Sequence, residues 1–165
     1  MAESLLITPG ATRAERYTEI LPQIKAVIAD EPNLVANLAN IAAILREGFG
    51  FFWVGFYLRD GNKDELVLGP FQGPLACTRI AWGRGVCGTA AQTGESQLVP
   101  NVHQFPGHIA CSSASQSEVV IPLMVNDTCQ MVLDIDSDQL EDFSTVDVKA
   151  LEGLMELLKE QHFVA

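Results

Sequence analysis

Apolar residues in the first third of the chain recur at helical spacing, which predicts two amphipathic helices within about residues 11–48. The first stripe covers residues 17–28 and contains Pro22, which we expect either to kink the helix or to mark a later start. The second stripe covers residues 34–45, and Gly48 is expected to end it. The pattern therefore predicts a helical layer at the beginning of the chain.

Short runs of β-branched and aromatic residues follow, and these predict strands. Turn residues bound the runs, such as Asn126 and Asp127 between the last two. Five segments fit this pattern: 51–58, 65–71, 97–99, 118–125 and 129–136. A doubly wound parallel sheet would need a helix between each pair of strands, so we expect an antiparallel sheet instead.

A final helix is predicted at about residues 144–162. Ser144 is expected to cap it, with Asp147 at the third helical position. Helices at both ends of a run of strands indicate an α+β fold with a central antiparallel β-sheet flanked by N- and C-terminal helices. The sheet and its loops would occupy about residues 50–137, so residues 1–165 are expected to form one domain.

The middle of the chain, residues 72–117, is rich in Gly, Pro and Ser, and only a brief helix is expected there, at 86–92. Residues 100–117 are expected to form a long irregular loop that contains His108 and Cys111. Long irregular loops inside compact domains are usually functional or disordered. We interpret this loop as functional because of the side chains that it carries.

The charge balance excludes several classes of partner. The 165 residues include 10 Lys and Arg against 21 Asp and Glu, for a formal net charge of −11. Such a surface repels phosphate groups and anionic lipids, so we expect no nucleic-acid partner and no membrane partner. No apolar run is long enough for a membrane span and no secretory signal is visible, which predicts a cytoplasmic protein.

Three of the four cysteines, Cys77, Cys87 and Cys111, lie in or beside the irregular middle. In a cytoplasmic chain we expect thiols rather than structural disulfides. The polar loop favours redox-active over inert thiols, because His108 could stabilise a Cys111 thiolate. Equally, His108 could hold its own loop by hydrogen bonds. Cys77 and Cys87 are both candidates to resolve an oxidised Cys111 as a disulfide.

A metal site is not expected from these residues. No C-x-x-C pair occurs, and the spacing of His103 and His108 relative to the cysteines is not typical of zinc sites. Cys129 lies in a predicted strand, and we interpret it as a buried apolar residue.

Trp53 and Tyr57 are four residues apart in a predicted strand, so they should lie on one face of the sheet, with Gly55 opening space between them. They are either ordinary core residues or the two walls of an aromatic slot for a methyl or thioether group. The pattern alone leaves both interpretations open.

Asp134 and Asp136 place two carboxylates on one face of a predicted strand. Such a pair is costly unless it meets a cation, shares a proton or reaches solvent. It therefore indicates an ammonium pocket, a proton donor or a solvated end of the sheet. Glu118 begins the preceding strand, but a plain two-residue hairpin would pair it with Ile135, on the opposite face. The three acids converge only if a bulge shifts the register.

The segment GRGVCG at residues 83–88 matches the G-x-G-x-x-G pattern of dinucleotide-binding turns. However, no long crossover helix follows it, and no acidic residue lies about 20 positions later. We therefore expect a tight turn that brings the backbone close to a small ligand or caps the sheet.

Residues 83–123, which include GVCGTAA and FPGHIAC, resemble the signature of the free methionine-(R)-sulfoxide reductases, enzymes built on a single GAF domain. WVGFYL at 53–58 and VLDIDS at 132–137 fit the same family in order and approximate spacing, so the likeness covers about residues 14–160. The resemblance implies a single GAF domain that reduces free, not peptide-bound, L-methionine-(R)-sulfoxide.

The resemblance also implies roles for the cysteines. Cys111 would attack the sulfoxide sulfur and become a sulfenic acid, Cys77 would resolve it as a disulfide, and thioredoxin would reduce that disulfide. Cys87 matches the third family cysteine, either as a helper or as an alternative resolving thiol. No bound cofactor is implied.

By the same resemblance, Glu118, Asp134 and Asp136 match the family's acidic pocket, and Trp53 and Tyr57 match its aromatic wall. One acid would protonate the sulfoxide oxygen, and the remaining carboxylates would hold the α-ammonium group of the free amino acid. Which acid donates the proton is left open.

The main alternative is a GAF-type sensor that binds a small molecule without catalysis, and a purely structural interaction module is the other. Sensors normally need an attached output domain, for which this length leaves no room. The oligomeric state is not readable from the sequence, although homodimers are common among GAF domains.

Overall fold

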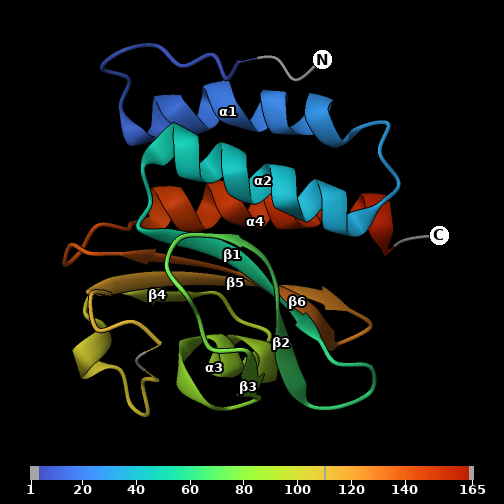
Figure 1. Cartoon of the computed structure of the whole chain (residues 1–165), viewed down its shortest axis with the longest axis vertical. Coiled ribbons are helices and arrows are strands. Elements are labelled where there is room, and N and C mark those ends of the chain that lie inside the picture. The colour runs from blue at the N-terminus through green and yellow to red at the C-terminus, as the bar shows by residue number, and fades with distance from the viewer. Residues whose placement is uncertain (1–3, 110, 164–165) are drawn as a thin grey trace.

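The structure is a computed structural model that describes residues 4–109 and 111–163 (Figure 1). The other positions of the predicted domain, 1–3, 110 and 164–165, lie outside the described residues. Figure 1 shows long helices on one side, a sheet in the middle, and a short helix with irregular loops on the other side. This arrangement confirms the predicted α+β fold with a central antiparallel sheet.

Three long helices lie on one side of the sheet. α2 (Leu34–Phe49) and α4 (Thr145–His162) lie next to the sheet, and α1 (Arg13–Ile28) packs on top of them. α3 (Gly85–Thr93) lies on the opposite side. Pro22 lies inside α1, which therefore starts well before it. In the part of the chain that the structure describes, no helix is both long and apolar enough to cross a membrane.

The sheet has six antiparallel strands in the order β3-β2-β1-β6-β5-β4. The strands are β1 Trp53–Arg59, β2 Glu65–Gln72, β3 Arg79–Ala81, β4 Gln97–Val99, β5 Ser117–Val125 and β6 Thr128–Ser137. The sequence pattern predicts all of them except β3, because three residues at a sheet edge are too few for an alternating pattern. The irregular loop after β4 also contains a short 3₁₀ helix, Val102–Gln104.

Local sequence signals account for most helix ends. At α4, Ser144 and Asp147 form a capping box, as predicted. The predicted end of α2 at Gly48 is wrong: the helix ends at Phe49 and is capped by Gly50, whose φ of 70° suits glycine. Gly48 lies inside α2, where a Cβ atom would collide with Ile20 of α1. This glycine serves the packing of two helices, which a one-dimensional pattern does not reveal.

Side chains alternate between the two faces of the sheet, and each face has its own core. Along β6, Met131, Leu133 and Ile135 pack into the core below the three long helices. Asp134 and Asp136 lie at the intervening positions and face the side of α3. The two-residue period of the strand thus directs both aspartates away from the main core.

Tyr17→Phe tests a buried polar contact between the first and last helices. The Tyr17 hydroxyl donates to Asp147 Oδ1 at 2.8 Å, and both side chains are buried. Without this donor we expect the free energy of unfolding to fall by about 1–2 kcal/mol, as measured with urea. Thr18→Ala, at the next and exposed position, should change it by less than about 0.5 kcal/mol. Equal stabilities of wild type and Tyr17→Phe would show that the hydrogen bond from Tyr17 to Asp147 contributes nothing to the free energy of unfolding.

Candidate active site

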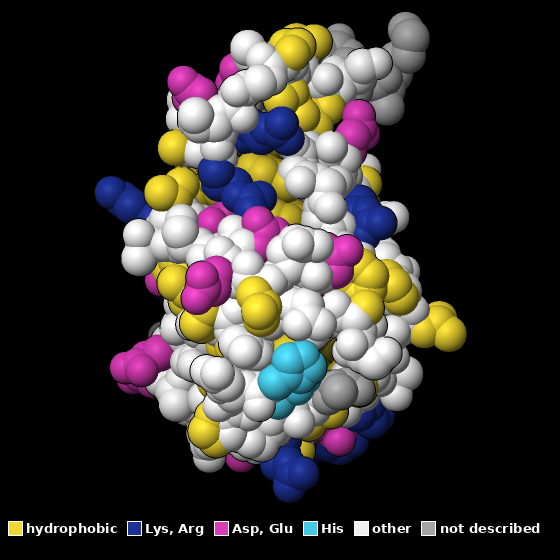
Figure 2. All heavy atoms as spheres, turned by 90° about the vertical axis from the view of Figure 1, so that its left-hand side faces the viewer, with side chains coloured by type: hydrophobic (Ala, Val, Ile, Leu, Met, Phe, Trp, Pro, Cys, Tyr) yellow, Lys and Arg dark blue, Asp and Glu magenta, His cyan; other side chains and the backbone are white. Residues whose placement is uncertain are grey.

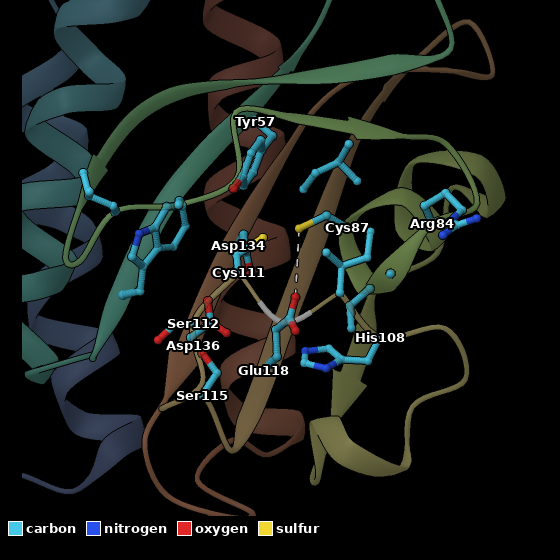
Figure 3. A pocket seen from close by; sticks show the side chains of 17 residues that line it. Tyr57, Arg84, Cys87, His108, Cys111, Ser112, Ser115, Glu118, Asp134 and Asp136 are labelled. Carbon is cyan, nitrogen blue, oxygen red and sulfur yellow. Dashed lines mark hydrogen bonds between the residues drawn. The ribbon is translucent and has the colours of Figure 1, made fainter.

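A pocket lies between the sheet, α3 and the irregular loops (Figure 3). Its volume is about 550 Å³ including its open mouth, which suits a small-molecule ligand. Strands β1, β5 and β6, helix α3 and the loop before β5 contribute to its lining. Seven of the eight predicted site residues line it: Trp53, Tyr57, Cys87, Cys111, Glu118, Asp134 and Asp136. The eighth, Cys77, is bonded to one of these.

Cys77 and Cys111 form a disulfide at the edge of the pocket. Their Cα atoms are 5.4 Å apart, although the residues are 34 positions apart in the chain. The bond joins the segment between β2 and β3 to the loop before β5. Cys111 is exposed and Cys77 is half-buried, whereas Cys87 is a buried free thiol. Of the two candidates that the sequence left open, the structure thus places Cys77 beside Cys111.

The predicted aromatic pair forms one wall of the pocket and is backed by a third ring. The ring centroids of Trp53 and Tyr57 are 6.0 Å apart, and Phe71 stacks on Trp53 at 5.4 Å. Trp53 Nε1–H donates to the Pro74 carbonyl and the Tyr57 hydroxyl donates to the Cys77 carbonyl, both at 3.0 Å. These bonds tie the rings to the segment that carries Cys77. The sequence pattern misses Phe71 because only the pairing of β2 with β1 brings it to Trp53.

Gly55→Ala tests the packing of this wall. The space at Gly55 is filled by Trp53 and Phe71, and a Cβ atom there would lie 2.6 Å from Trp53 Cη2. We expect the variant to lose about 1–3 kcal/mol of unfolding free energy and to show altered tryptophan fluorescence. Gly153→Ala is the matched control, because its Cβ atom would meet nothing within 4 Å and alanine favours the helix. Equal stability of the two variants would mean that the wall is loosely packed.

Glu118 joins the two aspartates because a bulge shifts the register of the β5–β6 hairpin. The shift lies between Leu123 and Met124, near the turn, and it places Glu118 opposite Asp136. Directly opposed residues in antiparallel strands share a face of the sheet. The bulge that the convergence of the three acids requires is therefore present, and Glu118 lies on the same face as the aspartates.

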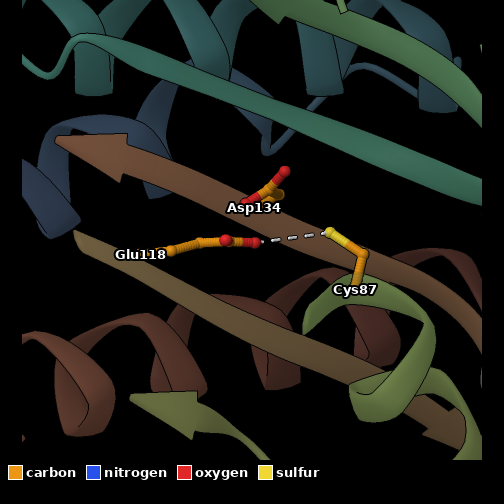
Figure 4. Close-up of side chains that lie close together, drawn as sticks. All are labelled: Cys87, Glu118 and Asp134. Carbon is orange, nitrogen blue, oxygen red and sulfur yellow. Dashed lines mark hydrogen bonds between the residues drawn. The ribbon is translucent and has the colours of Figure 1, made fainter. Parts of the chain in front are cut away.

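Cys87 completes a buried cluster with Glu118 and Asp134 (Figure 4). Its Sγ atom lies 4.0 Å from Glu118 Oε1. This sulfur atom and one carboxylate oxygen from each of the two acids all lie within 4.8 Å of one another. Asp134 Oδ1 has no hydrogen-bond partner among the described residues. The sequence predicted a redox role for Cys87 but not its place beside the acids, because no local pattern indicates that α3 packs against β5 and β6.

Burial controls the protonation of these groups. It raises the pKa values of Glu118 and Asp134 well above their ordinary range, and the charges of neighbouring carboxylates raise them further. Burial also raises the pKa of the Cys87 thiol, and the same two acids add to the effect. Burial raises the pKa of Asp136 to about 6, against a hydrogen bond from Ser115 that lowers it. Burial therefore favours the protonated forms of Glu118 and Asp134, whereas a pKa of about 6 leaves Asp136 mostly ionised at neutral pH.

His108 lines the pocket, but its environment does not favour the charged form that a thiolate partner needs. Burial lowers its pKa, and the neighbouring His103 lowers it further. The centroids of the two rings are 6.5 Å apart. Figure 2 shows a patch of histidine side chains, in cyan, at the surface of the molecule. The backbone N–H of His108 donates to the Phe105 carbonyl at 3.1 Å. That bond uses the backbone alone, so the alternative role, in which the His108 side chain holds the loop, stays a prediction.

The glycine-rich turn GRGVCG opens α3 as a turn, as predicted, and its Arg84 and Gly85 line the pocket. Gly83 and Gly85 have φ values of 75° and 61°, which favour glycine. At Gly88 a Cβ atom would collide with the Ala81 carbonyl of β3. No sequence signal singled out several further residues of the pocket lining: Leu75, Ala76, Ile80 and Ser115.

A sheet with long helices on one face and a ligand-sized pocket on the other defines a small-molecule-binding α+β domain. Residues 32–159 match the GAF domain family, and the chain belongs to this family. Homologues within it include free methionine-R-sulfoxide reductases, which confirms the resemblance seen in the sequence motifs.

Three relatives show how far the likeness extends. GAF domain-containing protein A of Dictyostelium discoideum is 54% identical over 96% of this chain and 99% of the relative. The free methionine-R-sulfoxide reductase of Escherichia coli is 44% identical over 90% of this chain and 89% of the relative. The X-ray structure of the free methionine-R-sulfoxide reductase of Neisseria meningitidis in complex with its substrate is 53% identical, with a TM-score of 0.91 and coverage of 94% and 93%. The likeness thus spans nearly the whole of each chain.

Proposed function

We propose that this chain is a free methionine-(R)-sulfoxide reductase. The observation that carries the proposal is the Cys77–Cys111 disulfide at the edge of a pocket with buried carboxyls. Reduction of a sulfoxide to a thioether takes up two electrons and two protons, which a pair of thiols and a buried carboxyl group can supply. Relatives that bear this name, one of them in complex with its substrate, support the proposal.

In the proposed reaction, the Cys111 thiolate attacks the sulfoxide sulfur while a protonated carboxyl, Glu118 or Asp134, donates its proton to the sulfoxide oxygen. The oxygen passes to Cys111 as a sulfenic acid, and methionine leaves as the thioether. The Cys77 thiol then attacks the sulfenic sulfur, which forms the disulfide and releases water. Two electrons from an external dithiol, thioredoxin in this proposal, restore both thiols.

The pocket also suits a free amino acid. Asp136 is mostly ionised at neutral pH and lies in the pocket lining, so it can hold the α-ammonium group of the substrate. A peptide-bound residue lacks this ammonium and would leave the carboxylate without a cation. Trp53 and Tyr57 would receive the methyl group and help to select the epimer.

A coupled assay with thioredoxin, thioredoxin reductase and NADPH tests the proposal. We expect NADPH oxidation with the free R epimer and none with the free S epimer or with peptide-bound methionine sulfoxide. Turnover of the peptide would contradict the role of the ammonium group. Turnover with a chemical dithiol but not with thioredoxin would reject thioredoxin as the reductant and leave the rest of the proposal intact. No turnover with either reductant would favour the sensor alternative.

Location and assembly complete the proposal. A cytoplasmic location fits a thiol enzyme that is reduced after each cycle, because that compartment keeps thiols reduced. No bound cofactor is needed in the steps above. A homodimer is a further expectation, which analytical ultracentrifugation would test.

A further inference from the structure

In the part of the chain that the structure describes, no positively charged side chain pairs with the cluster of Cys87, Glu118 and Asp134. None of the ion pairs among residues 4–109 and 111–163 includes Glu118, Asp134 or Asp136. Asp134 is only 6% exposed, and its Oδ1 atom has no partner among the same residues. Hydrogen bonds link Cys87, Glu118 and Asp134 to one another, but a buried carboxyl oxygen without a partner is costly, so the network is incomplete at Asp134 Oδ1.

The donor atoms are spaced much like ligands of a tetrahedral metal ion. Zn²⁺ binds thiolate sulfur at about 2.3 Å and carboxylate oxygen at about 2.0 Å, which places neighbouring ligand atoms roughly 3–4 Å apart. Cys87 Sγ and Glu118 Oε1 are 4.0 Å apart, and the set with Asp134 spans at most 4.8 Å. Figure 4 shows the three side chains converging from α3, β5 and β6. Side-chain shifts of about 1 Å would therefore bring all three to bonding distance.

We propose that Cys87, Glu118 and Asp134 bind Zn²⁺. The thiolate favours zinc over Mg²⁺ or Ca²⁺, which prefer ligand sets made only of oxygen. One sulfur and two oxygens leave a fourth position open to the pocket, for water or for Asp136 two residues along β6. The ion displaces the protons that the thiol and the carboxyls carry. The expectation of no metal site rested on the spacing of cysteine and histidine, whereas this site combines one cysteine with two carboxylates.

Zinc binding does not depend on the proposed reductase activity. If that activity is present, zinc and substrate exclude each other, because both use Glu118 and Asp134. Zn²⁺ then inhibits the reductase by competing with the substrate for the pocket.

The disulfide form of the intact protein allows the site to be tested alone, because Cys77 and Cys111 are bonded and only Cys87 and Cys129 are free thiols. Co²⁺ is the probe, since it replaces Zn²⁺ and a cobalt–thiolate bond absorbs in the near ultraviolet. We expect one equivalent of Co²⁺ to produce this band and one equivalent of Zn²⁺ to remove it.

Cys87→Ser should abolish the cobalt–thiolate band, and Glu118→Gln should weaken Co²⁺ binding at least about tenfold while it keeps the thiol. Cys129→Ser is the matched control, because Cys129 is also buried but does not line the pocket. It should bind Co²⁺ as wild type does. The proposal is overturned if wild type shows no saturable band, if Cys87→Ser keeps it, or if Glu118→Gln binds normally. None of these readouts requires turnover, so a failed reductase assay would not affect them.

Discussion

Cys111→Ser should abolish turnover of free methionine-(R)-sulfoxide, with a loss of at least about 10³-fold in kcat. A serine hydroxyl is a poor nucleophile at neutral pH and cannot hold the transferred oxygen as a sulfenic acid. The substitution also removes the disulfide that Cys111 forms with Cys77. The coupled NADPH assay measures the effect. Cys129→Ser should keep nearly full activity, because Cys129 lies outside the pocket lining.

Cys77→Ser should separate the first half of the reaction from the second. Cys111 remains free to attack, so we expect about one equivalent of methionine per protein chain in a chromatographic assay. The sulfenic acid then has no partner at the position of Cys77, and cycling with thioredoxin should stop. Normal cycling of Cys77→Ser would indicate that another thiol, such as Cys87, resolves the intermediate. Full activity of both Cys111→Ser and Cys77→Ser would defeat the thiol mechanism.

Replacement of the buried acids should have the second large effect. Glu118→Gln and Asp134→Asn keep the size of the side chain but remove the acidic proton, so we expect kcat to fall by roughly 10²–10⁴-fold in the variant that lacks the donor. Asp136→Asn should instead mainly raise KM, because this carboxylate is assigned to the ammonium group of the substrate. Steady-state kinetics with the free R epimer would show this division between kcat and KM.

A matched control for the acids is Glu152→Gln. Glu152 is an exposed carboxylate on α4 that accepts a hydrogen bond from Ser96, far from the pocket lining. This variant should keep wild-type kinetics, and thermal unfolding should show that all variants are folded. Unchanged kcat in both Glu118→Gln and Asp134→Asn would show that neither carboxyl protonates the sulfoxide oxygen. Unchanged kinetics in Asp134→Asn and Asp136→Asn would remove the aspartate pair from the mechanism.

Much of the fold follows from local patterns. The helical stripes, the capping signal at Ser144 and the alternating strands predict nearly every element, because helix and strand periods act over a few neighbouring residues. The same period of two predicts that Asp134 and Asp136 share a face. Local patterns fail where a residue serves a distant element, as at Gly48, which packs against α1 instead of ending α2.

The sequence by itself therefore determined the fold class, the family resemblance and the residues around which a site could form. Only the tertiary structure decided how these residues meet. The bulge near Met124 turns Glu118 toward the aspartates, and the course of two loops brings Cys77 rather than Cys87 to Cys111. Register and loop path depend on the packing of both partners at once, so no segment of the chain encodes them alone.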